Sequence, residues 1–194
     1  VPEDVTVTFV TGGSQGSLAL NRGVTAYVEA VSRDELSRPE LLHLLWSTGR
    51  RHFEGVSNAL EDAGEPSWVH ALPYVEDMPK ALAAADFALS RAGAMTIAEL
   101  LNEGLPAVLV PLPTAADDHQ THNARALEDA GAARVLPESE LDAERLAREI
   151  SSIAADRDAL DRMRAAARSR ARPDATQAIA SDVATFLPPV RRAA

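Results

Sequence analysis

Four short segments of the chain combine residue types that could bind a ligand, and each follows a stretch expected to be a β-strand. The first segment, from Thr11 to Ser17, reads Thr-Gly-Gly-Ser-Gln-Gly-Ser. Glycines let the backbone approach a ligand closely, and the free N–H groups at a helix start attract phosphate. The segment lacks the Gly-Lys-Ser/Thr ending of a P-loop and the Gly-x-Gly-x-x-Gly spacing of dinucleotide-binding proteins. It therefore predicts an anion site made of main-chain amides, with a plain tight turn as the alternative.

The second segment, from Ser90 to Glu99, joins a strand end, a glycine turn and a helix start. Helical spacing places Met95 and Glu99, which are four residues apart, on one face of that helix. Glu99 can then point back toward the glycine turn. A carboxylate accepts two hydrogen bonds, which matches the adjacent hydroxyls of a ribose. The alternative is an ordinary glutamate on a helix surface.

The third segment, from Pro113 to Asn123, is rich in polar side chains: Asp117, Asp118, His119, Gln120, His122 and Asn123. Two histidines and two aspartates suggest a metal site, but adjacent aspartates before a helix usually cap it. Polar groups at a helix start that face a crevice fit hydroxyl recognition better, so we expect no metal here.

The fourth segment, from Leu72 to Met78, is a short apolar and aromatic stretch. Such a stretch can offer backbone N–H and C=O groups to the edge of a planar base while its side chains flank the ring. A plain connection between a strand and a helix is the alternative.

The elements that would position these segments alternate in type along the chain. Strands are expected at Val5–Val10, Leu41–Trp46, Trp68–Leu72, Asp86–Leu89, Pro106–Val110 and Ala133–Leu136. Helices are expected at Ser17–Ser32, Arg50–Ala63, after Asp77, at Ala94–Asn102, from Asp117 or Asp118 to Ala130, and from Glu140 to Phe186 with a break near Pro173. Strands joined by helical crossovers are parallel, and ligands of open parallel sheets lie beyond the carboxyl ends of the strands. We therefore predict an α/β fold with a doubly wound, mainly parallel, six-stranded Rossmann-like sheet, forming one domain over residues 1–187 with a frayed tail at 188–194.

Composition excludes several classes of protein. The 194 residues are 46% hydrophobic and 25% charged, which is typical of a packed domain. A net charge of -10 disfavours binding to nucleic acid or anionic lipid. The sequence has no cysteine, no apolar run near the roughly 20 residues of a membrane span, and no signal-like start. We expect no nucleic-acid partner, no membrane insertion of this domain and a cytoplasmic location.

Five motifs in register carry a resemblance to a known family: Gly-Gly-Ser-Gln-Gly at 12–16, Tyr-Val-Glu-Asp-Met at 74–78, Ser-Arg-Ala-Gly-Ala at 90–94 with Thr96 and Glu99, Gly-Leu-Pro-Ala at 104–107, and Asp-His-Gln-x-x-Asn-Ala at 118–124. The chain resembles the C-terminal, donor-binding half of the MurG family of GT-B glycosyltransferases. Members of that family transfer N-acetylglucosamine from UDP-GlcNAc to the undecaprenyl-linked muramoyl-pentapeptide lipid of peptidoglycan synthesis. The resemblance covers nearly the whole chain.

The resemblance implies a role for each matching position. Gly13, Ser14, Gln15 and Gly16 would hold the diphosphate. The backbone of Val75, with Tyr74 beside it, would read uracil, and Glu99 would bind the ribose. Contacts to the diphosphate or the sugar would come from Ala94, Met95, His119, Gln120 and Asn123. The family commonly has His-Gln where this chain has Trp46-Ser47, so the role of that pair stays open.

The resemblance also implies an inverting transfer that needs no metal or other cofactor. The general base and the acceptor site for the lipid would lie in an N-terminal domain, so no catalytic residue is assigned within these 194 residues. The complete enzyme would be peripheral on the cytoplasmic face of the inner membrane.

Two other functions remain open at this point. One is a free-standing donor subunit of a two-chain lipid-linked N-acetylglucosamine transferase. The other is a UDP-sugar-binding protein or one half of a UDP-sugar epimerase, although an epimerase needs acid and base carboxylates and only Glu99 clearly qualifies.

Overall fold

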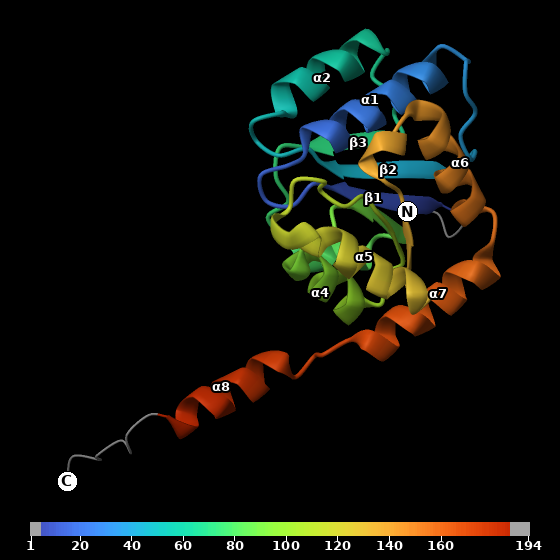
Figure 1. Ribbon diagram of the computed structural model, residues 1–194. Helices are drawn as coiled ribbons and strands as arrows, with labels where there is room; N and C mark the ends of the chain where they lie inside the picture. Colours follow the sequence, from blue (N-terminus) through green and yellow to red (C-terminus); the bar gives the residue numbers. More distant parts are fainter. Residues whose placement is uncertain (1–4, 187–194) are drawn as a thin grey trace.

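The computed structural model describes residues 5–186 and contains one six-stranded sheet (Figure 1). Every strand pair is parallel, and the spatial order is β3-β2-β1-β4-β5-β6. The strands are β1 (Thr6–Thr11), β2 (Leu42–Ser47), β3 (Val69–Leu72), β4 (Phe87–Ser90), β5 (Ala107–Leu109) and β6 (Ala133–Val135). The six predicted strands and their parallel, doubly wound arrangement are confirmed.

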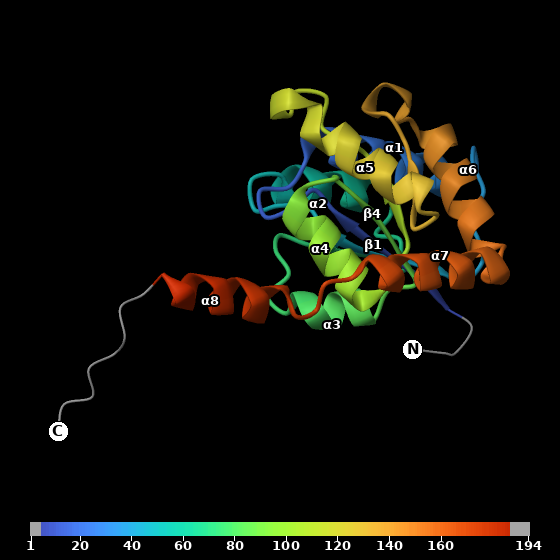
Figure 2. The ribbon, with the colours of Figure 1, turned by 60° about the horizontal axis from the view of Figure 1, so that its bottom comes forward.

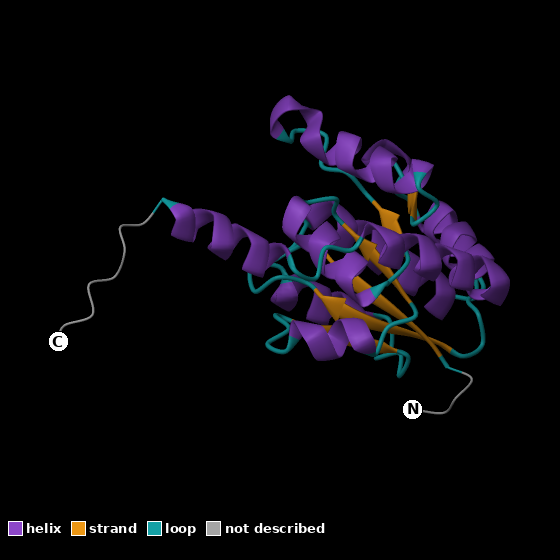
Figure 3. Ribbon diagram, turned by 90° about the horizontal axis from the view of Figure 1, so that it is seen from below, coloured by secondary structure: helices purple, strands orange, loops and turns teal. Residues whose placement is uncertain are grey.

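Helices cover both faces of the sheet, as Figures 1 and 3 show. The helices are α1 (Leu18–Ser32), α2 (Phe53–Asp62), α3 (Met78–Ala83), α4 (Ala94–Glu103), α5 (His119–Asp129), α6 (Ala143–Ala154), α7 (Arg157–Arg170) and α8 (Ala175–Thr185), with short 3-10 turns η1 (Ala116–Asp118) and η2 (Glu138–Glu140). One layer contains α1, α2 and α6, and the other contains α4 and α5 (Figure 1).

Strand β1 lies at the centre of the sheet and is buried on both faces. Its alternating side chains serve two separate cores, since Phe9 packs with the helices of one layer and Val10 with those of the other. This explains why the strand reads as a nearly continuous run of apolar and β-branched residues rather than as an alternating one.

Two local predictions need correction. The expected helix from Glu140 to Phe186 is interrupted near Asp156 as well as near Pro173, because Asp142 and Asp156 each accept a hydrogen bond from a backbone N–H and start a new helix. Asp118 does occupy the N-cap position of α5, but its carboxylate makes no capping bond and instead accepts one from the Thr121 hydroxyl at 2.6 Å.

Helix α8 extends away from the rest of the molecule (Figures 1 and 2). None of its residues is buried: Ile179 and Val183 are 63% and 53% exposed, and Phe186, which follows the helix as its C-cap, is 85% exposed. The proposed tail at 188–194 lies outside the described residues, and the domain limits stay a prediction. Within residues 5–186, no helix combines the length and the apolar character that crossing a bilayer requires.

Candidate functional site

The carboxyl ends of β1 and β4 meet at the centre of the sheet, where the strand order reverses direction. Chain connections on the two sides of this point lead to opposite faces, which leaves a crevice at the rim of the sheet. The segment after β1 leads into α1, and the segment after β4 leads into α4. The first two predicted ligand-binding segments therefore face each other.

The glycine segment after β1 forms a closed turn. The Gly13 N–H donates to Thr11 Oγ1 at 3.1 Å, and the Gly16 N–H donates to the Gly13 carbonyl at 3.0 Å. Gly13 has a φ of +81°, which L-residues with side chains rarely adopt. Within residues 5–186 the amides of Ser14 and Gln15 donate no hydrogen bond, so both are available to an anion, whereas those of Gly13 and Gly16 are already used.

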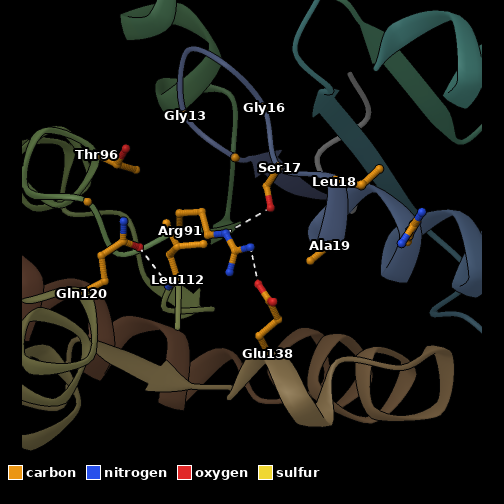
Figure 4. Close-up of a pocket in the computed structure, with 13 residues that line it drawn as sticks. Gly13, Gly16, Ser17, Leu18, Ala19, Arg91, Thr96, Leu112, Gln120 and Glu138 are labelled. Atoms are coloured by element: carbon orange, nitrogen blue, oxygen red, sulfur yellow. Dashed lines mark hydrogen bonds and ion pairs between the residues drawn. The ribbon is translucent and has the colours of Figure 1, made fainter. Parts of the chain in front are cut away.

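A cavity of about 570 Å³ lies between the starts of α1 and α4 (Figure 4). Its lining includes Gly13 and Gly16 from the first segment, and Gly93 and Thr96 from the second. Gly93 is the N-cap of α4, has no capping side chain and faces open space. Both helices thus direct their positive N-terminal ends toward one volume, which suits a negatively charged group.

A second cavity, of about 240 Å³, continues from the first on the side of β3. Gly13 and Thr96 line both cavities and mark their junction. The lining of the smaller cavity includes the following predicted site residues: Gly13, Ser14, Tyr74, Val75, Met95 and Glu99. The structure therefore brings the segments after β1, β3 and β4 together around one space.

The Tyr74 ring at this cavity lies against the Arg50 guanidinium. The guanidinium carbon of Arg50 lies 5.2 Å from the ring centroid, and Arg50 also forms an ion pair with Glu76 at 3.6 Å. Val75 is buried and Glu99 is exposed on α4. Tyr74 and Val75 give this cavity an apolar surface that suits a flat apolar group, and the exposed Glu99 carboxylate can accept hydrogen bonds from hydroxyls.

The predicted residues of α5 are placed differently from one another. Gln120 lines the larger cavity, but its Oε1 accepts a hydrogen bond from the Leu112 amide at 3.1 Å (Figure 4). The same oxygen accepts a second hydrogen bond, from the Ala92 amide at 3.2 Å. The Asn123 Nδ2 donates to the Ala92 carbonyl at 3.1 Å. Both side chains therefore brace the turn between β4 and α4, which leaves the Gln120 Nε2 group as the part available to a ligand.

Four of the predicted residues line neither of the two cavities. Gln15 and His119 are exposed on the rim, and the His119 Nδ1 donates to the Ala116 carbonyl at 2.8 Å. Ala94 and Asn123 line a third cavity, of about 550 Å³, between α4 and α8. Across residues 5–186, no three histidine, aspartate or glutamate side chains gather as a metal site would require.

Sequence reasoning missed several residues of the two cavities. Arg91 and Glu138 form an ion pair at the larger cavity, and Ser17 lies beside them (Figure 4). Arg91 belongs to the Ser-Arg-Ala-Gly-Ala motif of the second segment, so the sequence could have identified it as a site residue. Glu138 follows β6, and nothing in its local sequence distinguishes it from the surface glutamates nearby.

The open question about Trp46 and Ser47 has a structural answer. Trp46 is fully buried, and its Nε1 donates to Asn21 Oδ1 at 3.1 Å. The Asn21 Nδ2 in turn donates to the Thr48 carbonyl at 2.8 Å. Ser47 lines the smaller cavity. Trp46 therefore supports the segment after β2 from within the core, whereas Ser47 is positioned to meet a ligand.

Comparison with known families agrees with this geometry. Residues 7–179 match the glycosyltransferase family 28 C-terminal domain. The chain belongs to this family. Curated proteins match it over most of its length. It is 44% identical over 183 residues, 94% of the chain, to the UDP-N-acetylglucosamine--N-acetylmuramyl-(pentapeptide) pyrophosphoryl-undecaprenol N-acetylglucosamine transferase of Salinibacter ruber. It is 46% identical over 172 residues, 89% of the chain, to the Alkalilimnicola ehrlichii protein of the same name.

The chain spans 47% and 46% of the length of these two relatives. Among solved structures, MurG of Acinetobacter baumannii superimposes with a TM-score of 0.80 at 33% identity, over 95% of this chain and 54% of that one. A Staphylococcus aureus MnaA–UDP co-structure superimposes with a TM-score of 0.69 at 13% identity, over 94% of this chain and 46% of that one, which shows a shared fold. The predicted glycosyltransferase family and the Rossmann-like half of a GT-B fold are confirmed.

Proposed function

We propose that this domain binds UDP-GlcNAc and presents it as the donor for transfer of N-acetylglucosamine to a lipid-linked acceptor. The observation that carries the proposal is the pair of adjoining cavities at the reversal of the strand order, with two helix N-termini directed at the larger one. The donor and the acceptor are those that the names of the two curated relatives state.

The shape of the crevice matches the parts of a nucleotide sugar in order. The uridine would occupy the smaller cavity, with uracil beside Tyr74 and Val75 and the ribose hydroxyls on Glu99. The diphosphate would pass the junction at Gly13 and Thr96. The sugar would then extend into the larger cavity toward Gln120, with Gln15 and His119 at the rim, whereas Ala94 and Asn123 lie at the third cavity.

The chemistry that this domain would contribute is stabilisation of the leaving group. As the acceptor hydroxyl attacks the anomeric carbon with inversion, the bond to UDP breaks and negative charge grows on the diphosphate. The positive ends of α1 and α4 face the larger cavity, and the amides of Ser14 and Gln15, free in the described part of the chain, would donate hydrogen bonds to that charge. A transfer that needs no metal follows from such preorganised donors and remains part of the proposal.

The acceptor site and the general base would belong to the half of the relatives that this chain does not span. An exposed apolar row on α8, formed by Ile179, Val183 and Phe186, supports a covering partner, because an isolated helix of this length is marginal in water. We propose that the covering surface is that acceptor half, and that the assembled enzyme is peripheral on the cytoplasmic face of the inner membrane.

Calorimetry with UDP tests the proposal directly, and competition among UDP-GlcNAc, UDP-glucose and UDP-galactose tests the sugar. We expect saturable UDP binding and no turnover by the domain alone. UDP at a hundredfold over its Kd should raise the unfolding free energy by about 2.7 kcal/mol. A melting temperature that UDP leaves unmoved would contradict the proposal.

A further inference from the structure

Arg91 lies at the larger cavity and ties three other segments to the end of β4. Its Nε donates to Ser17 Oγ at 3.0 Å, at the start of α1. Its Nη1 donates to the carbonyl oxygens of Val110 and Pro111 after β5, at 3.2 and 3.1 Å. Its Nη2 pairs with the Glu138 carboxylate after β6 (Figure 4). Four of the five guanidinium N–H groups are therefore committed to protein acceptors.

This arrangement makes Arg91 a poor phosphate ligand in spite of its position. The side chain is only 9% exposed, and Glu138 balances its charge. Its geometry is instead that of a fixed support, because a planar guanidinium with four bonds cannot rotate without breaking several of them.

Ser17, at the start of α1, also keeps a hydrogen-bond donor that is free within residues 5–186. Its Oγ accepts from the Leu20 amide at 3.4 Å and from the Arg91 Nε at 3.0 Å. A hydroxyl oxygen has two lone pairs and one proton, so both acceptor positions are used and the proton must be donated elsewhere. The part of the chain that the structure describes gives this proton no acceptor, and Ser17 lines the larger cavity.

We propose that the Ser17 hydroxyl donates a hydrogen bond to the β-phosphate of a bound nucleoside diphosphate, and that Arg91 is the positioning residue that directs it. The assignment to the β-phosphate follows from location, because Ser17 lines only the cavity beyond the Gly13 and Thr96 junction, away from the nucleoside. This inference rests on the proposed function and extends its anion site from main-chain amides to one side chain.

Calorimetry with uridine, UMP and UDP on the full chain separates the β-phosphate from the rest of the ligand. Ser17→Gly removes the hydroxyl and keeps a residue that is accepted at an N-cap. We expect UDP affinity to fall roughly tenfold, as for a lost hydrogen bond to a charged group, and UMP affinity to stay the same. Ser17→Thr, which retains the hydroxyl, should keep the wild-type preference for UDP over UMP.

The positioning role of Arg91 is tested by non-additivity. Arg91→Lys keeps the charge but loses the Nε donor, so it should reduce the preference for UDP over UMP in the wild type and have no further effect on that preference in Ser17→Gly. If Arg91→Lys does not fold, the double replacement Arg91→Met with Glu138→Leu removes both charges and leaves no unpaired carboxylate.

The outcomes separate the two hypotheses. Failure of the wild-type chain to bind UDP overturns the proposed function. Wild-type UDP binding together with an unchanged ratio of UDP to UMP affinity in Ser17→Gly overturns the Ser17 assignment and leaves the proposed function standing. Additive losses from Ser17→Gly and Arg91→Lys overturn the positioning role.

Discussion

Gly16 and Gly49 lie backbone against backbone, and neither position has space for a side chain. A Cβ atom on Gly16 would stand 2.1 Å from the Thr48 carbonyl oxygen, and one on Gly49 would stand 2.5 Å from the Gln15 carbonyl oxygen. Both glycines also have a positive φ, of +75° and +85°. The segments after β1 and β2 therefore support each other through their main chains, and the amides of the anion site depend on this contact.

Gly16→Ala should lower the unfolding free energy by about 2 kcal/mol or more, because the clash and the left-handed backbone both disfavour alanine. Urea unfolding measures this. Gly55→Ala is the matched control: Gly55 lies in α2 with open space around its Cα, so alanine there should add about 0.5–1 kcal/mol. Equal stability of the Gly16 variant and the wild type would show that the two segments can separate without cost.

Glu99→Ala should weaken UDP binding about tenfold, because it removes a charged acceptor for the ribose hydroxyls. The melting temperature of the free domain should stay unchanged, since Glu99 is exposed and forms no ion pair within residues 5–186. Glu103→Ala, at the other end of α4, is the control and should bind as the wild type does. The wild type should also bind 2′-deoxy-UDP more weakly than UDP, and Glu99→Ala should not discriminate between them.

Asn21→Asp should lower the unfolding free energy by about 3 kcal/mol. An aspartate could still accept from the Trp46 indole, but it would bring an unpaired carboxylate against the Thr48 carbonyl in the core. Asn102→Asp is the control, because the Asn102 side chain is exposed and only accepts a hydrogen bond, from the Arg172 amide. Chemical denaturation of the two variants should give clearly different midpoints.

Acidification should destabilise the chain partly through His43. Burial, followed by the neighbouring His70 and Arg38 charges, lowers the pKa of His43 below its usual value, and its Nδ1 lies 3.0 Å from the His70 Nε2. The unfolded state then binds more protons than the folded state as the pH falls. The contribution of neutral His43 to the free energy of unfolding is therefore complete above the ordinary histidine pKa of about 6.5 and is lost as the pH falls below it.

Thermal melts at pH 7.5 and pH 5.0 measure this effect. His43→Gln should lose less stability than the wild type over that interval, whereas the control His122→Gln, which removes one exposed imidazole from α5, should follow the wild type. If the melting temperatures of all three proteins change equally with pH, His43 does not contribute to the acid sensitivity.

Local patterns predicted the elements, and contacts between distant segments decided the site. The run of β-branched residues before Gly12 and the cap at Asp77 act within a few residues, and both appear in the structure. The role of Glu138 depends on where the chain returns after β6, which short-range patterns do not contain. The partners of Gln120 likewise come from the segments after β4 and β5, so its bracing role needed the folded chain.

The third cavity, between α4 and α8, connects α8 to the nucleotide site. Met95 and Glu99 line both that cavity and the one expected to hold uridine. A single turn of α4 is therefore the wall between the nucleoside and whatever covers α8. A surface that binds α8 and reorients Met95 or Glu99 would change the surroundings of a bound nucleoside without contacting the nucleoside. Ligand binding in one half of such an enzyme would then affect the other half through these two side chains.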